Sequence, residues 1–228
     1  MATLLHLLAD HHRLLVLDAA SAGVQVGLLR SDAPAEWRRT DDEAGTGIFA
    51  GTDALLSEAG LKLDDLGAFV FCEGPGSMLG TRTIAMALRT WQVIKPRPTY
   101  AYQSLALAAR FAWTLSPRAF AVIADARRDT WHVQMVSADG TLAPLQRVAA
   151  TALPAGELLT PENFRAWAPP PRPAATCSYG LARLFAALGT DDLFRPVAAP
   201  DAFQHEAPDY KKWSAQVHSA ATAKGIRP

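Results

Sequence analysis

The most informative part of the sequence is the stretch Glu73-Gly74-Pro75-Gly76-Ser77-Met78-Leu79-Gly80-Thr81-Arg82. An apolar run at residues 68–72 precedes it, and a helical pattern follows at residues 81–94. Glycine permits backbone angles that a Cβ atom forbids, and proline fixes its own φ, so the Gly-Pro-Gly run predicts a tight turn. Ser77 is suited to cap the helix by accepting a backbone N–H. We therefore expect a strand, a turn and a helix in direct succession.

Two roles for this turn are open at this point. The free N–H groups of a helix N-terminus can bind an anion. The same turn can instead reverse the chain and let the helix lie close on a sheet, because glycine leaves room for a neighbouring backbone. The first role predicts a ligand site and the second predicts a packing device.

Length and composition limit the possible functions. The chain has 228 residues, half of them hydrophobic, which suffices for one large domain or two small lobes. Lysine plus arginine and aspartate plus glutamate both number 22, so the formal charge is zero. Strong nucleic-acid binding depends largely on clustered positive charge. We therefore expect any RNA contact to require a more basic partner.

The cysteines and the N-terminus indicate a cytosolic protein. Cys72 and Cys177 lie far apart and have no metal-ligand spacing, so no disulfide framework is implied. No apolar run reaches the roughly 18–20 residues of a membrane span, and residues 1–8 lack the basic flank of a signal peptide. Three early histidines have no acidic or cysteine ligand at suitable spacing and are interpreted as a solvated terminus: His6, His11 and His12.

Predicted strands and helices alternate along the chain. In the first half, strands are expected at residues 14–18, 24–29 and 68–72, and helices at 43–59 and 81–94. In the second half, strands are expected at 120–125 and 131–136, and helices at 104–113 and 179–188. Residues 30–43 are polar, and residues 168–173, which include four prolines, are predicted to form a surface connector.

The two halves share one pattern. Each contains a strand that ends in an aspartate, a small turn and a returning strand, at residues 14–29 and 120–136. This repetition predicts two related α/β lobes with mixed sheets, joined near residue 100. We place the N-terminal lobe at residues 1–103 and the C-terminal lobe at residues 104–228.

Several charged residues are candidates for a site. Asp18 and Asp125 could face a shared cleft and hold Mg²⁺ through water, or each could cap its own turn. Arg82 could bind an acid or a carbonyl across the lobes, or stay solvated. Arg127 and Arg128 could contact RNA or an acidic partner, or form a solvated turn. Neither Gly-x-Ser-x-Gly nor His-Glu-x-x-His occurs, so no peptidase chemistry is indicated.

Four motifs together resemble the bacterial TsaB family, also called YeaZ. They are Leu17-Asp18-Ala19-Ala20, the run from Gly74-Pro75-Gly76-Ser77 to Gly80-Thr81-Arg82, Ser104-Leu105, and Asp125-Ala126-Arg127. The order and spacing fit over residues 14–136, and later positions match only loosely, at Tyr179-Gly180 and Pro208-Asp209-Tyr210. The resemblance implies the two-lobed actin/Hsp70/sugar-kinase fold, which is ribonuclease-H-like, with mixed sheets flanked by helices and a reduced second lobe.

The resemblance also implies a function. TsaB is the accessory subunit of the machinery that makes threonylcarbamoyladenosine on tRNA, next to the anticodon of ANN-decoding tRNAs. The catalytic subunit TsaD carries a His-x-x-x-His metal pair on its first long helix, and residues 43–49 of this chain contain no histidine. We therefore expect a non-catalytic subunit without a cofactor or metal. Its partners would be a TsaD-like protein and a TsaE-like ATPase, and it would contact tRNA only through the complex.

This sequence departs from the family pattern at several motif positions. Ala19 and Leu79 stand where the family has hydroxyl residues, and Thr130 and His132 stand where it has glutamate and tyrosine. The missing hydroxyls weaken any expectation of nucleotide or magnesium binding in a cleft. They affect a packing role less.

The two long helices of the first half are predicted to form the partner interface, and a free homodimer would use the same helices. The residues proposed for it are Ile48, Thr52, Leu55, Ala59, Ile84, Leu88 and Trp91. The alternative is that each helix covers its own sheet. A second functional hypothesis is a stand-alone nucleotide-binding phosphotransferase or hydrolase of the same fold, which would use Asp18.

Overall fold

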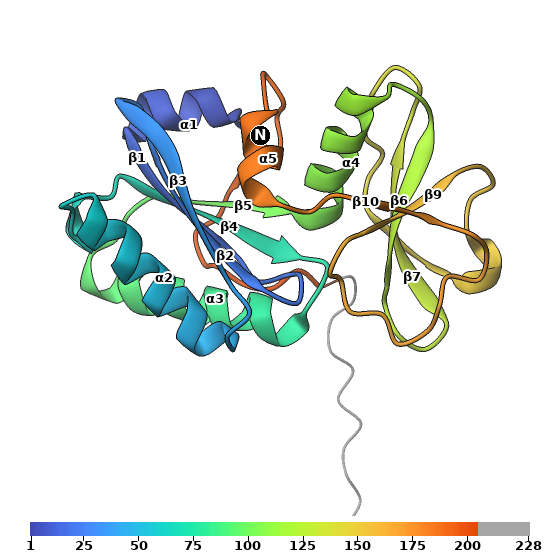
Figure 1. Cartoon of the computed structure of the whole chain (residues 1–228), viewed down its shortest axis with the longest axis horizontal. Coiled ribbons are helices and arrows are strands. Elements are labelled where there is room, and N and C mark those ends of the chain that lie inside the picture. Colours follow the sequence, from blue (N-terminus) through green and yellow to red (C-terminus); the bar gives the residue numbers. More distant parts are fainter. Residues whose placement is uncertain (205–228) are drawn as a thin grey trace, which may run out of the picture.

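The computed structural model describes residues 1–204 as two β-sheets with helices around them (Figure 1). Residues 205–228 are not described, so the motif predicted at residues 208–210 lies outside this range. Within the described residues, no helix is long and apolar enough to cross a membrane.

The first sheet is mixed, with the strand order β11-β5-β4-β1-β2-β3. β1 pairs antiparallel with β2, and β2 pairs antiparallel with β3, whereas β4 is parallel to β1 and β5 is parallel to β4. The strands are β1 (Arg13–Asp18), β2 (Val24–Arg30), β3 (Ala33–Thr40), β4 (Ala68–Gly74), β5 (Thr99–Gln103) and β11 (Arg195–Pro196).

Helices cover both faces of this sheet. α2 (Ala44–Glu58) and α3 (Met78–Ile94) lie along one face, and α1 (Leu4–His11) lies on the other (Figure 1). Because side chains alternate across a strand, Leu15 and Leu17 of β1 pack under α2 and α3, whereas Leu14 and Val16 face the opposite core. A short 3₁₀ helix, η1 (Leu63–Asp65), follows α2.

The second sheet repeats the order of the first, as β10-β9-β6-β7-β8. β6 pairs antiparallel with β7, β7 pairs antiparallel with β8, β9 is parallel to β6, and β10 is parallel to β9. The strands are β6 (Phe120–Asp125), β7 (Thr130–Val136), β8 (Gln146–Ala149), β9 (Leu158–Pro161) and β10 (Ala175–Cys177). Only a short 3₁₀ helix, η2 (Ala150–Ala152), and loops join β8, β9 and β10. This lobe is therefore reduced.

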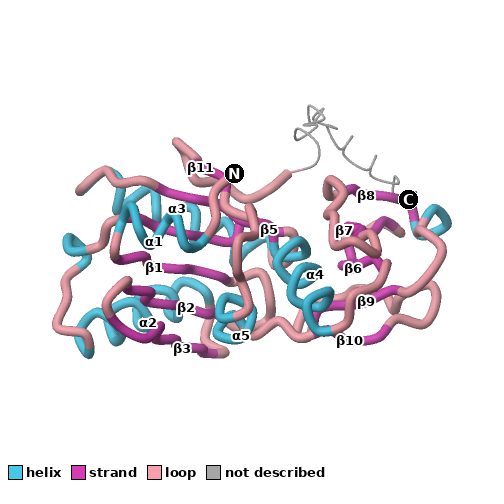
Figure 2. Tube along the Cα trace, turned by 90° about the horizontal axis from the view of Figure 1, so that it is seen from above, coloured by secondary structure: helices cyan, strands magenta, loops and turns pink. Residues whose placement is uncertain are grey.

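One helix joins the two lobes. α4 (Ser104–Leu115) lies between the sheets (Figures 1 and 2), and its buried side chains share a core with Val70 of the first sheet and Val122 of the second. α5 (Leu181–Ala186) packs beside it, with the Phe185 ring 5.2 Å from that of Trp37 on β3. The predicted fold class, two lobes with mixed sheets flanked by helices, is confirmed.

Several elements differ from the sequence prediction. The polar segment after β2 forms the edge strand β3, whose side chains are mostly exposed and so lack an apolar pattern. β5, β8, β9 and β10 were not predicted, because each has only three to five residues. Near the start, α1 buries Leu4 and Leu7, and His11 lies 2.9 Å from the Tyr100 hydroxyl. The segment is therefore an ordered helix and His11 has a partner, whereas His6 and His12 are exposed as predicted.

The division of the chain between lobes also differs. The sequence analysis assigned every residue after 103 to the second lobe. Instead, β11 pairs antiparallel with β5, and Phe194 forms a β-bridge with Ala2. The chain therefore returns to the first sheet after α5.

Candidate functional site

The Gly-Pro-Gly turn is built as a close contact between two loops. Ser77 caps α3, because its Oγ accepts the Gly80 N–H at 3.3 Å, and its own N–H donates to the Ala20 carbonyl at 2.7 Å. A Cβ atom at Gly76 would lie 2.4 Å from the Ala20 oxygen, and one at Gly80 would lie 2.1 Å from the Ala19 oxygen. Both glycines are thus required by the approach of the loop after β1.

This geometry favours the packing role of the turn. The Ser77 N–H is bonded to the backbone of the loop after β1. The Pro75 carbonyl accepts the Ser104 hydroxyl at the start of α4. Gly74 has a φ of +116°, in the region that favours glycine. The turn therefore joins β4, α3, α4 and the end of β1 as a packing device.

Asp18 lies at the end of β1 and is completely buried. Its Oδ1 accepts the Ala20 N–H at 2.8 Å, and its Oδ2 accepts the hydroxyls of Tyr102 and Tyr179 at 2.6 and 2.7 Å. Burial raises the pKa of the Asp18 carboxyl, and these hydrogen bonds offset part of that rise. Burial, with the nearby Asp18 carboxyl, also raises the pKa of both tyrosines well above its ordinary value.

The tyrosine cluster ties the two lobes together. Tyr179 follows β10 of the second sheet, and its N–H donates to Glu162 at 2.9 Å. Its carbonyl accepts the Gln25 side-chain amide of β2 at 3.1 Å. Because every oxygen of Asp18 is satisfied inside the protein, this carboxyl holds the junction of the lobes.

Asp125 occupies the equivalent end of β6 but has different surroundings. It is half-buried, and its Oδ1 accepts the Arg127 N–H at 2.6 Å. Its Oδ2 accepts the N–H groups of Trp167 and Ala168 at 2.6 and 3.0 Å. Each aspartate therefore caps its own turn. Of the two alternatives left open by the sequence, the structure supports turn capping, because Asp18 has no solvent-exposed surface with which to face a cleft.

The two predicted arginines are both exposed. Arg82 lies on the outer side of α3, and within residues 1–204 it forms no hydrogen bond or ion pair. The Arg127 guanidinium lies over the ring of Trp167, 4.7 Å from its centroid. Arg82 is thus solvated within the described residues, and Arg127 belongs to a separate site on the second lobe.

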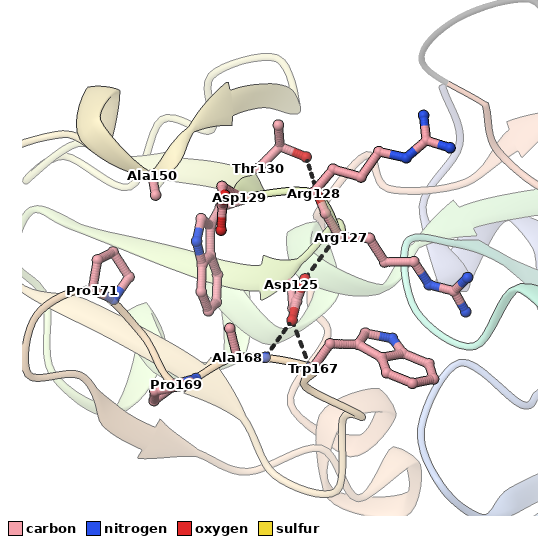
Figure 3. A pocket seen from close by; sticks show the side chains of 11 residues that line it. Asp125, Arg127, Arg128, Asp129, Thr130, Ala150, Trp167, Ala168, Pro169 and Pro171 are labelled. Carbon is pink, nitrogen blue, oxygen red and sulfur yellow. Dashed lines mark hydrogen bonds between the residues drawn. The ribbon is translucent and has the colours of Figure 1, made fainter.

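That site is a cavity of about 460 Å³ beside the β6–β7 hairpin (Figure 3). Its lining includes Asp125 and Arg127, which the sequence analysis identified, together with the proline-rich segment that it treated as a plain connector. Trp167 gave no periodic signal, since it lies in a loop. Its position depends on the long-range hydrogen bond to Asp125.

The residues proposed for the partner interface are largely internal. Six of the seven are buried, namely five apolar residues and Thr52, and Ala59 is half-buried. They pack against the first sheet in one apolar core, with Trp91 5.6 Å from the Phe69 ring. The five are Ile48, Leu55, Ile84, Leu88 and Trp91. The expectation that these side chains face outward is wrong, because both sides of α3 are apolar and the sequence did not distinguish them.

The outer side of the same helices carries several large apolar side chains among polar ones. Leu79, Met86 and Val93 of α3 are 77%, 58% and 87% exposed, and they recur every seven residues along one line. Phe49 of α2 is 48% exposed and meets Trp91 edge-on at 5.7 Å. A groove of about 710 Å³ runs beside it between α2, η1 and α3. We call this surface the outer helix face, defined by Phe49, Leu79, Met86 and Val93.

The strand order, the mixed pairing and the flanking helices define a two-lobed ribonuclease-H-like fold. Solved structures of this kind include YeaZ from Pseudomonas aeruginosa, which is 21% identical to this chain with a TM-score of 0.59. The alignment covers 76% of this chain and 89% of that one. A second structure, an uncharacterized protein from Pseudomonas aeruginosa with similarity to peptidase YEAZ, matches with the same identity and TM-score over 76% and 88% of the two chains. At this identity the likeness shows a shared fold.

Comparisons of the sequence itself add no family assignment. No protein-family model matches the chain, and no curated protein matches it. The motif resemblance and the shared fold therefore stand as two separate observations.

Proposed function

We propose that the chain is a non-catalytic subunit that binds a TsaD-like protein and activates it in the synthesis of threonylcarbamoyladenosine on tRNA. The modified nucleoside lies next to the anticodon of ANN-decoding tRNAs, and a TsaE-like ATPase is the third component. The YeaZ fold and the motif resemblance support this role. The chain contacts tRNA through the assembled complex in this proposal.

The observation that carries the proposal is the outer helix face. Three large apolar side chains recur at a spacing of seven residues and so lie along one line of α3, where a partner helix can pack. Exposed apolar side chains that gather on one helix surface are typical of protein interaction sites. The groove beside Phe49 adds a recess into which a partner side chain fits. We therefore place the docking surface on the outer side of α2 and α3.

The buried aspartate argues against the alternative of a stand-alone phosphotransferase. Such an enzyme would use Asp18 to hold Mg²⁺ and a phosphate, which needs a carboxylate open to the cleft. In this chain Asp18 accepts three internal hydrogen bonds and has no exposed surface. Titration calorimetry of the purified chain with Mg-ATP should give no saturable heat, whereas a stoichiometric signal abolished by Asp18→Asn would favour the enzyme.

The docking surface is tested by co-elution with the TsaD homologue of the same organism. The double variant Met86→Glu/Val93→Glu places two charges on the outer helix face without touching the core. We expect the wild-type chain to co-elute at micromolar concentration and the double variant to elute separately. Modification of tRNA by the reconstituted subunits should fall with it.

Leu115→Glu is the matched control, because Leu115 is a 65% exposed apolar residue at the end of α4, away from the proposed surface. This variant should bind like the wild type. If the double variant still co-elutes fully while its fold is intact by circular dichroism, the outer helix face is not the docking surface. Light scattering of the free chain shows in parallel whether a homodimer uses the same face.

A further inference from the structure

The cavity on the second lobe combines an apolar wall with a cationic rim. Its lining includes the buried indole of Trp131, together with Ala150, Pro169 and Pro171. Figure 3 shows Arg127 and Arg128 extending together on the side of Trp167, away from Pro169 and Pro171. The cavity is about 460 Å³, within the range of small-molecule sites. One end thus suits a flat apolar group, and the other suits an anion.

Within residues 1–204, no ion pair neutralises the arginines of this rim or the neighbouring Arg165. Arg127, Arg128 and Arg165 are exposed, and in the part of the chain that the structure describes none of them forms an ion pair. The Arg165 guanidinium lies 4.1 Å from the centroid of the Trp167 ring, beside that of Arg127. Both guanidinium groups contact the Trp167 ring by cation–π interactions. Such a contact uses the flat face of a guanidinium, so its N–H groups at the edge remain available to donate to an anion.

The carboxylates of the site have separate roles. Asp125 accepts hydrogen bonds from three backbone N–H groups. These bonds hold the hairpin and the Trp167 loop in place around the cavity. The exposed side chain of Asp129 remains as an acceptor, while its backbone carbonyl accepts the Ala150 N–H at 2.8 Å. A hydroxyl or an amino group of a ligand would complement this carboxylate.

The hairpin backbone is unusual at the same place. Arg127, Arg128 and Asp129 have φ values of 65°, 51° and 54°, although none is glycine. Single residues in this region are uncommon, and such strain is found preferentially at functional sites. Here the conformation carries Arg127 and Arg128 out to one side of the cavity, as Figure 3 shows.

We propose that this cavity binds a nucleotide, with the base against the Trp131 and proline wall and the phosphate on Arg127 and Arg128. A sugar hydroxyl or base amino group would donate to Asp129. The nucleotide is either free or one residue of a single-stranded RNA, since both present the same chemistry. Positively charged side chains along the phosphate backbone are a usual feature of single-strand binding. The inference is independent of the TsaD partnership, because it concerns a different lobe and the isolated chain.

An acidic peptide is the main alternative occupant. Its carboxylates would bind the arginines, but its acidic side chains would not fill the apolar cavity beside them. The observation that favours a nucleotide is the pairing of a cationic rim with a wall of tryptophan, alanine and proline. The neutral composition of the whole chain fits a small local site with modest affinity, not an extended nucleic-acid surface.

The test is fluorescence anisotropy of a short dye-labelled single-stranded RNA with the full-length chain. Competition with AMP and with a glutamate-rich peptide separates the possible occupants. We expect binding that weakens about sevenfold between roughly 50 and 200 mM salt, as two phosphate contacts would give. Arg127→Ala/Arg128→Ala should remove most of this salt dependence and weaken binding by about tenfold.

A second variant tests the cavity without changing any charge. Ala168→Leu fills the cavity from its exposed loop, and it should weaken binding by roughly fivefold if a base enters. Arg38→Ala on β3, an exposed arginine that pairs with Glu58 at the end of α2 in the first lobe, is the matched control and should bind like the wild type.

The outcomes are distinct. Competition by AMP supports the proposal with a free nucleotide as ligand. RNA binding that AMP does not reduce, but that both cavity variants weaken, supports it with a strand as ligand. The proposal is overturned if no RNA binds at low salt, if Ala168→Leu binds normally, or if the peptide competes as well as RNA. The outer helix face is intact in every variant, so failure here leaves the TsaD proposal untouched.

Discussion

The two sheets have the same strand order but different coverings. In the first, β3-β2-β1-β4-β5 is crossed by the long helices α2 and α3, which fill one face completely. In the second, β8-β7-β6-β9-β10 has only η2 and loops at the corresponding connections. The same topology thus presents a helical surface in one lobe and a loop-lined cavity in the other.

This difference shows how one fold offers two kinds of binding surface. A helix that buries one side in a core still has an outer side, which suits a second helix. A loop leaves recesses and free side chains, which suit a small ligand. We accordingly assign protein docking to the first lobe and nucleotide binding to the second.

The largest expected effect separates the two sides of α3. Leu88 is completely buried and Met86, two residues earlier, is 58% exposed. Leu88→Glu places an unpaired charge in the core of the first sheet and should reduce the free energy of unfolding by at least about 3 kcal/mol. Met86→Glu should change it by less than about 0.5 kcal/mol. Urea denaturation measures both, and equal losses would mean that α3 does not cover the sheet as described.

A smaller effect is expected at the close contact beneath the Gly-Pro-Gly turn. Gly80→Ala forces a methyl group against the Ala19 backbone oxygen, which cannot rotate away, and should cost about 1–3 kcal/mol. Gly45→Ala is the matched helical control, because a Cβ there meets nothing within 4 Å. It should be neutral or stabilising by up to about 1 kcal/mol. Thermal unfolding compares the two, and a harmless Gly80→Ala would contradict the packing role of the turn.

The smallest effect concerns Asp18, the aspartate that ends β1. Because the pKa of Asp18 is raised on folding, the folded state binds its proton more tightly than the unfolded state. The resulting stability is fully present below the unfolded pKa and is lost as the pH rises through the folded pKa. Asp18→Asn, which does not titrate, should lack this loss. The variant should therefore become more stable relative to the wild type as the pH rises. Urea denaturation of both proteins at several acidic pH values measures this change in relative unfolding free energy. A constant difference would show that Asp18 is not perturbed.

Features that depend on residues close together in the sequence could be predicted from it. Ser77 was predicted to cap α3, and its hydroxyl does so. The strand before it, the two strands that end in Asp18 and Asp125, and the repeat of that pattern in both halves were also predicted correctly. In each case the signal is local, since turn residues and periodic apolar residues act within a few positions.

Features that depend on distant contacts were not readable. The hydrogen bond between Asp18 and Tyr179 joins residues 161 positions apart. Because of it, a carboxylate that the sequence offered as a possible ligand group instead connects the two lobes in the interior. In the same way, the hydrogen bond from Trp167 to Asp125 holds the proline-rich connector against the β6–β7 hairpin, where it lines the cavity. Nothing in either local pattern specifies its partner.

By itself, the sequence determined the alternation of elements, the two-lobed plan and the turn before α3, because backbone preference and apolar spacing are properties of short segments. Only the tertiary structure decided that Leu88 and Trp91 point inward while Leu79, Met86 and Val93 point outward. Both sets are apolar, and which set is buried depends on where the first sheet lies relative to the helix. The position of a surface is a long-range property, so the choice of docking residues had to come from the folded chain.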